Sequence, residues 1–196
     1  MTLTIPPSSL ALICFAFAAL LLVALHLLPT GADPVRHGVS EYGIGPFASL
    51  YRAQAIASGV GAIALADALL GTSVDTGPLI CLVLFGAARV LIAGFPTDRD
   101  LPMTRTGQIH AVLAAVAFLA LAVVAPWLSA SPFAAAAWPA ARVGVLGLAV
   151  VVTATSLGSF AVASLPGAVR AYGLAQRAFY LAGFAWLIAI AMLLPH

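Results

Sequence analysis

The sequence predicts an all-α polytopic membrane protein, built as a single bundle of six transmembrane helices. Of its 196 residues, 63% are hydrophobic and 7% are charged, and the mean hydropathy is +1.14. Soluble domains carry about 25% charged residues. A water-soluble fold would need more surface charge than this chain holds, so the composition indicates a lipid environment. The net charge of +2 is too small to indicate a nucleic-acid partner.

Six apolar windows are long enough to cross a bilayer, which takes about 20 helical residues. They account for most of the chain, so residues 1–196 are predicted to form one domain. The Pro, Gly and charged residues gather between the windows, and proline cannot continue a helix. Pro29, Pro96, Pro126 and Pro166 are therefore predicted to stop helices. The windows are residues 8–28, 47–70, 77–95, 107–128, 141–164 and 173–194.

The first window is predicted to stay in the protein, because no Lys or Arg precedes it and it exceeds the about 7–15 apolar residues of a signal peptide. The second carries Ala53, Ala57 and Gly61 at every fourth position. Small residues let helices approach closely in lipid, so this stripe is predicted to lie at a helix interface. The third window holds Arg89 and ends before Pro96.

The fourth window places His110 about one turn inside its start. The fifth carries Thr155 and Ser159 four positions apart, with Gly158 beside them, and this stripe is also predicted to lie at a helix interface. The sixth places Gln176 and Arg177 about one turn inside its start.

The arginines predict how the bundle is oriented. With six spans, the first, third and fifth loops share one side, and these loops with their helix ends hold seven of the eight arginines. Arg142 is the exception. Basic residues accumulate in cytoplasmic loops. The protein is therefore predicted to lie in the cell (inner) membrane, with the odd-numbered loops in the cytoplasm and both termini on the outer side. The count loses its force if the arginines serve a binding site. The seven are Arg36, Arg52, Arg89, Arg99, Arg105, Arg170 and Arg177.

The stretch GFPTDRDLPMTRTGQIH, residues 94–110, concentrates charge in a chain that has little. At the same predicted end, Arg89 lies about 9 Å inside the third window, at 1.5 Å per residue. Seven arginines there face four carboxylates, those of Asp33, Glu41, Asp98 and Asp100. Buried arginines need partners, and Asp98 and Glu41 are the predicted ones. The surplus of guanidinium suits phosphate or carboxylate.

Two sets of site residues follow. Acid–base chemistry, if the protein is an enzyme, is assigned to Asp98, His110 and Glu41. Ligand binding is assigned to Arg52, Arg89, Arg177, Gln176 and Tyr51. At the opposite end, Asp67 and Arg142 are predicted to form a structural pair.

No metal site and no particular cofactor are predicted. A mixed set of nitrogen and oxygen ligands could be drawn from His37, Glu41, Asp98 and His110, but no HExxH or Cys/His cluster supports it. Haem ligation by His26 and His110 is a further alternative. The chain has no P-loop and no GxSxG.

Four segments together resemble a known family. They are SEYGIGPFASLYR before the second window, GFPTD after the third, TGQIH opening the fourth and GLAQR opening the sixth. In these the chain resembles the prokaryotic six-helix membrane family catalogued as domain of unknown function 998. The resemblance covers nearly the whole chain, and its most specific parts are Phe95–Asp98 and His110. It implies six spanning helices and assigns no reaction.

The leading hypothesis is a binding protein or enzyme for an anionic amphiphile, such as a lipid or an isoprenoid-type molecule, with membrane lipids as partners. A small transporter is one alternative, but it predicts polar residues near the midplane, where these windows are almost bare. A structural or regulatory subunit is the other. The sequence is compatible with a homo-oligomer and does not identify the ligand.

Overall fold

The computed structural model describes residues 5–99, 102–165 and 167–196. Each predicted window corresponds to one long helix, whose ends lie within three residues of the predicted ones. Three short helices that the windows did not predict are η1 (Val39–Ile44), α5 (Pro132–Ala137) and η2 (Ala168–Ala171). The long helices are α1 (Pro7–Leu27), α2 (Ala48–Leu69), α3 (Thr76–Ile92), α4 (Arg105–Ala130), α6 (Arg142–Ser164) and α7 (Tyr172–Leu193).

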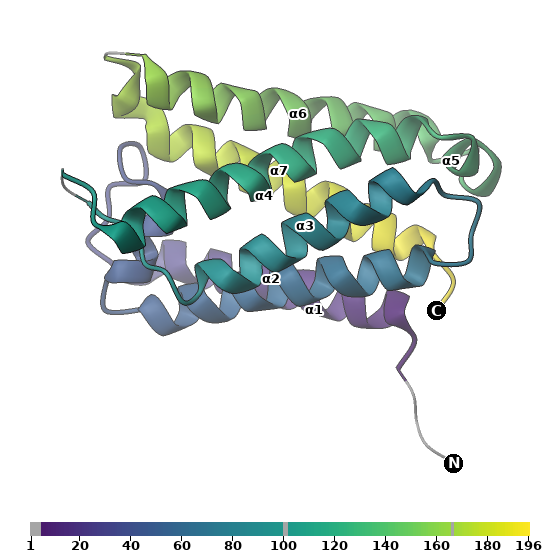
Figure 1. The fold of residues 1–196 in the computed structure, drawn as a ribbon, viewed down its shortest axis with the longest axis horizontal. Helices are drawn as coiled ribbons and strands as arrows, with labels where there is room; N and C mark the ends of the chain where they lie inside the picture. Colours follow the sequence, from purple (N-terminus) through teal and green to yellow (C-terminus); the bar gives the residue numbers. More distant parts are fainter. Residues whose placement is uncertain (1–4, 100–101, 166) are drawn as a thin grey trace.

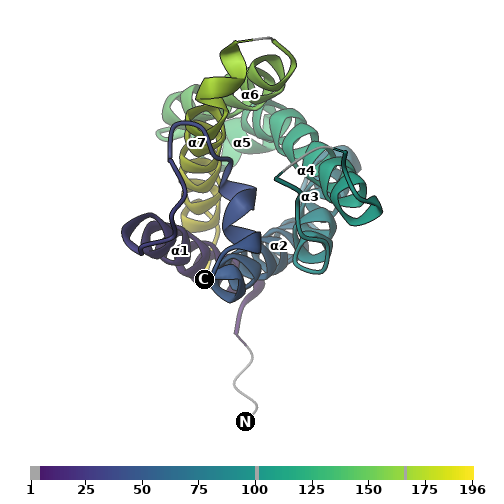
Figure 2. The same cartoon turned by 90° about the vertical axis from the view of Figure 1, so that its left-hand side faces the viewer.

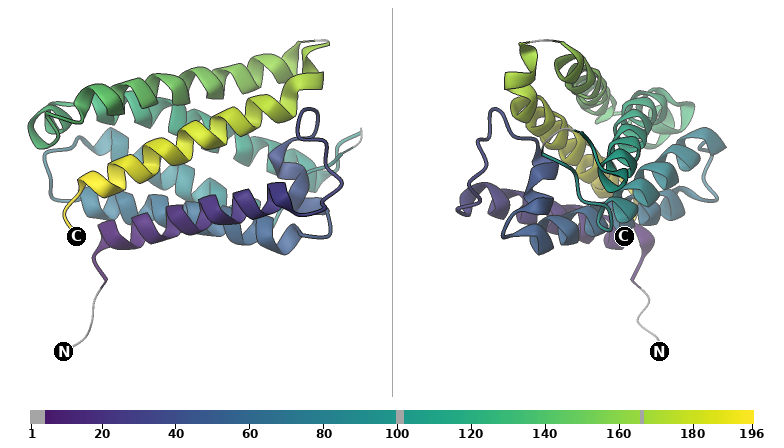
Figure 3. Two further views of the ribbon diagram at one scale, coloured as in Figure 1. Left: turned by 180° about the vertical axis from the view of Figure 1, so that it is seen from behind. Right: turned by 60° about the vertical axis from the view of Figure 1, so that its left-hand side comes forward.

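The long helices run alongside one another, and helices consecutive in the chain are neighbours in space (Figure 1). The α7 helix returns to α1 and closes the ring, as the end-on view in Figure 2 shows. The start of α1 and the end of α7 lie at one end of the bundle (Figure 3, left), where Ser8 Oγ donates a hydrogen bond to the Pro195 carbonyl. The opposite end, here called the polar end, consists of residues 28–47, the described residues of 93–104 and those of 165–171.

The protein is an all-α membrane protein. Within the described residues, α1, α4, α6 and α7 are long and apolar enough to cross a bilayer, and α3 is an apolar helix of 17 residues. Large apolar side chains such as Phe17, Leu20 and Leu181 are exposed on the outer surface. Such side chains are stable where they face lipid.

Glycines set the closest helix crossings. A Cβ on Gly59 of α2 would lie 2.5 Å from the Gly86 carbonyl oxygen of α3, and one on Gly86 would lie 2.7 Å from the Gly59 oxygen. Gly61 belongs to the predicted stripe of small residues on α2. A Cβ added to Gly61 would lie 2.8 Å from the Phe15 ring of α1. Without a hydrophobic force between helices in lipid, this close contact is what holds neighbours together.

The prediction that Pro126 stops a helix is wrong, because α4 continues through it to Ala130. A proline has no N–H to donate to the residue four positions earlier, here Ala122. Thr153 of α6 compensates, since its Oγ1 donates to the Ala122 carbonyl at 2.9 Å. Pro29 and Pro96 do follow the ends of α1 and α3, and Pro166 lies outside the described residues.

The Thr153 bond gives a first testable prediction. Thr153→Val should lower the free energy of unfolding by about 1 kcal/mol, because the Ala122 carbonyl loses the donor that Thr153 supplies in lipid. Unfolding in mixed detergent micelles measures this. Thr155→Val is the matched control, since Thr155 Oγ1 donates to the Val151 carbonyl of its own helix at 2.7 Å. Equal losses for the two variants would contradict the compensating role.

Candidate functional site

Asp98 and Thr104, from the charged stretch that ends at His110, cap the start of α4. The Asp98 carboxylate accepts hydrogen bonds from Thr104 N at 2.6 Å and from Thr104 Oγ1 at 3.1 Å. Thr104 Oγ1 in turn accepts from Gly107 N at 3.1 Å, as an N-cap side chain does. A Cβ on Gly107 would overlap the Asp98 carboxylate, so this close approach requires glycine. The positive end of the helix dipole also favours a carboxylate here.

His110 lies one turn further along α4 and is held by a single bond. Its Nδ1 donates to the Phe95 carbonyl at 2.7 Å, because a carbonyl oxygen only accepts. The bond joins the predicted FPTD segment to α4 and fixes the orientation of the ring. The other ring nitrogen, Nε2, has no hydrogen-bond partner among the described residues.

Four of the predicted site residues meet in one cavity, here called the cleft. They are Glu41, Asp98, His110 and Gln176, and the cleft volume is about 250 Å³. Figure 1 shows α4 and α6 spreading apart toward the polar end, with α7 behind them. The remaining lining residues are Ser40, Thr97, Met103, Gly107, Ala111, Ala114, Ala115, Phe118, Ser159, Phe160, Ala163 and Tyr172.

The η1 helix forms one wall of the cleft and is fixed by two polar side chains. Glu41 accepts from Gly38 N at 3.0 Å and forms an ion pair with Arg99, whose Nε lies 3.2 Å from Oε2. Gln176 of α7 accepts from Val39 N at 2.7 Å and donates to the Tyr172 hydroxyl at 2.6 Å. Glu41 and Gln176 therefore shape the cleft as well as lining it.

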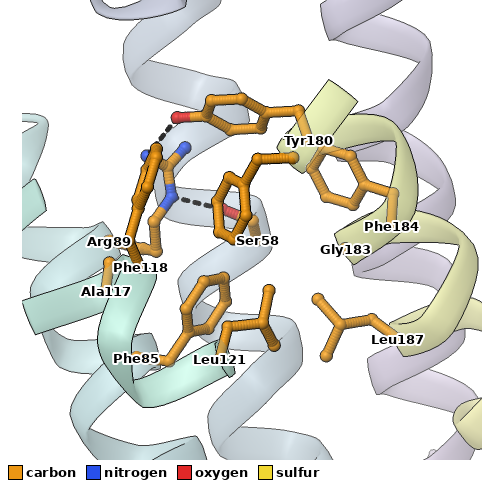
Figure 4. A pocket seen from close by; sticks show the side chains of 11 residues that line it. Ser58, Phe85, Arg89, Ala117, Phe118, Leu121, Tyr180, Gly183, Phe184 and Leu187 are labelled. Carbon is orange, nitrogen blue, oxygen red and sulfur yellow. Dashed lines mark hydrogen bonds between the residues drawn. The ribbon is translucent and has the colours of Figure 1, made fainter. Parts of the chain in front are cut away.

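Arg89 is buried in the bundle interior, with 2% of its surface exposed. Its guanidinium donates to Ser58 Oγ at 3.1 Å, to the Tyr180 hydroxyl at 2.8 Å and to Gln54 Oε1 at 2.7 Å. Figure 4 shows the first two of these bonds. The predicted ion pair with Asp98 or Glu41 is wrong for the described residues, because Arg89 reaches across to α2 and α7 while Asp98 caps α4 and Glu41 pairs with Arg99.

The other predicted binding residues do not converge on the cleft. Tyr51 is buried beside Arg89, away from the cleft. Arg52 is exposed on the outer surface of α2. Arg177 donates to His26 Nε2, to the carbonyls of His37 and Gly173, and to the Tyr42 hydroxyl. These bonds hold α1 and the first loop against α7, so the predicted cluster of three guanidiniums is not formed.

Sequence reasoning missed the partners of Arg89, which are Gln54, Ser58 and Tyr180. A signal for them exists in the spacing. Tyr51, Gln54 and Ser58 follow one another by three and four positions and so lie on one face of α2. On α7, Tyr180 follows Gln176 by four positions, which continues the polar stripe that begins at Tyr172.

Three further expectations can be compared with the structure. Among the described residues, no three His, Cys, Asp or Glu side chains gather as a metal site would require. Both ring nitrogens of His26 are hydrogen-bonded, to the Leu22 carbonyl and to Arg177, so the ring is not free to ligate haem. Asp67 and Arg142 are both exposed and form no ion pair, which corrects the predicted one. Asp100 lies outside the described residues.

The sequence profile of the family described as "Protein of unknown function (DUF998)" matches residues 12–193. The chain belongs to this family. The resemblance predicted from the four segments is thereby confirmed. No curated protein and no solved structure matched the chain.

The DUF998 match includes every residue of the cleft and every partner of Arg89. It also includes the Asp98–Thr104–Gly107 cap and the Phe95–His110 bond. The cleft and the Arg89 cluster are therefore both built inside the DUF998 domain, and neither depends on residues that lie outside the matched span.

Proposed function

We propose that this protein binds an amphipathic molecule in the cleft, with the head group at Glu41, Asp98 and His110 and the tail between α4 and α6. The observation that carries this proposal is the division of the lining. Polar side chains lie toward η1 and the α4 cap, and alanines with Phe118 and Phe160 lie toward the bundle. Ligand sites are mostly apolar with a few convergent polar groups, as here.

The route into the cleft supports a ligand that comes from the bilayer. Ala111 of α4 and Ala163 of α6 both line the cleft and are exposed on the outer surface. Two helices that spread apart with small residues on their facing sides leave room for an acyl or isoprenoid chain. A lipid tail would enter laterally from the bilayer, between α4 and α6, and would stay in an apolar environment throughout. Only the head group would lose contacts with water and gain contacts with the protein.

The polar lining favours a head group that donates hydrogen bonds, such as a hydroxyl or an ammonium. Two carboxylates face the cleft, and one of them is paired with Arg99. The guanidiniums on which the anionic ligand was predicted lie elsewhere, with Arg52 outward and Arg177 bonded to the first loop. We assign His110 Nε2 as the acceptor of a head-group proton, since the Phe95 carbonyl holds the proton on Nδ1.

We also propose six spans, with the polar end in the cytoplasm and both termini outside. The α2 and α3 helices run beside the four strongly apolar helices (Figure 1), so a bilayer that contains those four would contain all six. Apart from Arg89 and Arg177, which are buried or partly buried, five exposed arginines lie in the polar end or in the helix ends next to it, against Arg142 at the other end. This excess agrees with a cytoplasmic polar end. The five are Arg36, Arg52, Arg99, Arg105 and Arg170.

Filling the mouth of the cleft tests the binding proposal. Ala163→Phe should remove most of the lipid that stays bound through purification, because its ring would occupy the space between α4 and α6. Native mass spectrometry of the protein released from detergent measures the bound lipid and its mass. Ala161→Phe is the matched control, since Ala161 is exposed two positions away on α6 and does not line the cleft. Equal lipid content in both variants and the wild type would overturn the proposal.

A further inference from the structure

One arginine of α7 holds the end of α1 and the first loop in place. The Arg177 guanidinium donates to His26 Nε2 of α1 and to the His37 carbonyl of the first loop, both at 2.8 Å. It also donates to the Tyr42 hydroxyl of η1 at 2.8 Å. The three acceptors come from three segments that meet beside α7 at the polar end (Figure 2). Losing one of these bonds would therefore weaken the attachment of a whole segment to α7.

The hydrogen bonds of His26 fix its protonation state. A carbonyl oxygen only accepts, so the bond of 2.7 Å to the Leu22 carbonyl places a proton on Nδ1. A guanidinium only donates, so the bond from Arg177 Nε requires a lone pair on His26 Nε2. Unlike a hydroxyl oxygen, an imidazole nitrogen that carries a proton has no lone pair left to accept with. Both contacts can therefore exist only while the ring is neutral.

A second proton on His26 would break its contact with α7. The proton would set Nε2–H against the N–H of Arg177 Nε, and the charged ring would lie beside a guanidinium. In the described part of the chain, the titratable and charged groups in contact with the ring are Arg177 and Tyr42, whose ring centroid lies 5.4 Å away, edge-on. No carboxylate of the described residues lies within 4.0 Å of His26 or Arg177. The charged ring therefore gains no counter-ion here.

A second histidine in the first loop has a similar bond but a different environment. His37 Nδ1 accepts from Asp33 N at 3.0 Å, and a backbone N–H only donates, so this nitrogen also carries no proton. The charged groups beside His37 are Asp33 and Arg36, which form an ion pair at 3.7 Å. A hydrogen bond from Val35 N holds the pKa of the Asp33 carboxyl below its usual value. The Asp33 carboxylate would stabilise a charged His37 ring, so we expect the larger loss at His26.

We propose that His26 is a pH-sensitive switch, and that its protonation releases the end of α1 and the first loop from α7. The folded protein requires the neutral ring, whereas the unfolded chain is free to bind the proton. Stability should therefore rise with pH across the range in which histidine titrates, about pH 5–8. The first loop leads into η1, where Val39 N is bonded to Gln176, so the release would reach a wall of the cleft. The switch does not depend on what the cleft binds.

Thermal unfolding of the purified full-length protein at about pH 5.5 and about pH 7.5 tests the proposal. The side-chain carbonyl of His26→Gln can accept from Arg177 but gains no charge, so on acidification its melting temperature should fall by about 2–4 °C less than that of the wild type. His26→Phe keeps a ring beside Tyr42 but offers no acceptor, so it should have the lower melting temperature at both pH values. Equal losses on acidification in the wild type and in His26→Gln would overturn the proposal.

Hydrogen exchange shows where the structure opens. Leu174 N donates to the Val35 carbonyl at 3.2 Å, so this amide should lose protection at the lower pH in the wild type and keep it in His26→Gln. The rates are first corrected for the intrinsic pH dependence of exchange. His196→Gln is the control and should respond as the wild type does, because the His196 ring contacts Ser9 Oγ at the opposite end of the bundle. Equal loss of protection in the wild type and His26→Gln would assign the response to another group and contradict the switch.

Discussion

Gly173→Ala is expected to destabilise the protein more than any other single methyl group added to it. A Cβ at this position would lie 2.5 Å from the His37 carbonyl oxygen, 2.6 Å from that of Pro34 and 2.8 Å from that of Val35. These are backbone atoms, so the clash cannot be relieved by a rotamer change. The first loop would have to leave α7, at a cost of about 3 kcal/mol or more.

The loss should extend to the polar end as a whole. The displaced loop carries the bond from Leu174 N to the Val35 carbonyl and the bond from Arg177 to the His37 carbonyl. It also leads into η1, which forms a wall of the cleft through Val39 and Gln176. The melting temperature in detergent and the lipid retained through purification should therefore both fall.

Gly144→Ala is the control for this effect. Gly144 lies in α6 with no atom within 4 Å of a built Cβ, so the methyl group meets no obstacle. Alanine is the better helix former, and the variant should be equally stable or more stable by about 0.5–1 kcal/mol. A Gly173→Ala protein as stable as the Gly144→Ala protein would show that the first loop does not pack on α7 as described.

The long helices were predictable because an apolar stretch in lipid has little choice of structure. Every backbone group must be bonded within the segment, which only a helix achieves for a single stretch. Their ends were predictable where a proline follows, as at Pro29, but not at Pro126. The difference lies in Thr153 on another helix, and no local rule reveals which hydroxyl will reach a freed carbonyl.

The position of each site residue along its helix could be predicted from the sequence. The direction in which its side chain points could not, because it depends on how the helix is rotated about its own axis. In a soluble protein, the polar residues of a helix mark its exposed face, so the sequence also reveals the buried face. A helix that is apolar on all sides gives no such signal. The position of each residue relative to the ends of the apolar windows indicated that Arg89 is buried and that Glu41, Asp98 and His110 lie at one end of the bundle. It could not show that Arg52 points outward or that Arg89 turns toward Gln54 and Tyr180.

The Asp98 cap on α4 gives the second large prediction. Gly107→Ala should cost about 2 kcal/mol of unfolding free energy, because the added Cβ would displace the Asp98 carboxylate from Thr104. Asp98→Ala should cost a similar amount, since it removes the same two hydrogen bonds. Both variants should also retain less lipid, because Asp98 lines the cleft.

The double variant separates this mechanism from a general intolerance of α4 to substitution. Once Asp98→Ala has removed the carboxylate, the Cβ of Gly107→Ala has nothing to displace, so adding it should cost close to nothing. The two losses should therefore fall short of additivity by about 2 kcal/mol, within the range measured for residues in direct contact. Additive losses would mean that the carboxylate and the glycine act independently. In that case the close approach of residues 98 and 107 would not be what fixes the α4 end of the cleft.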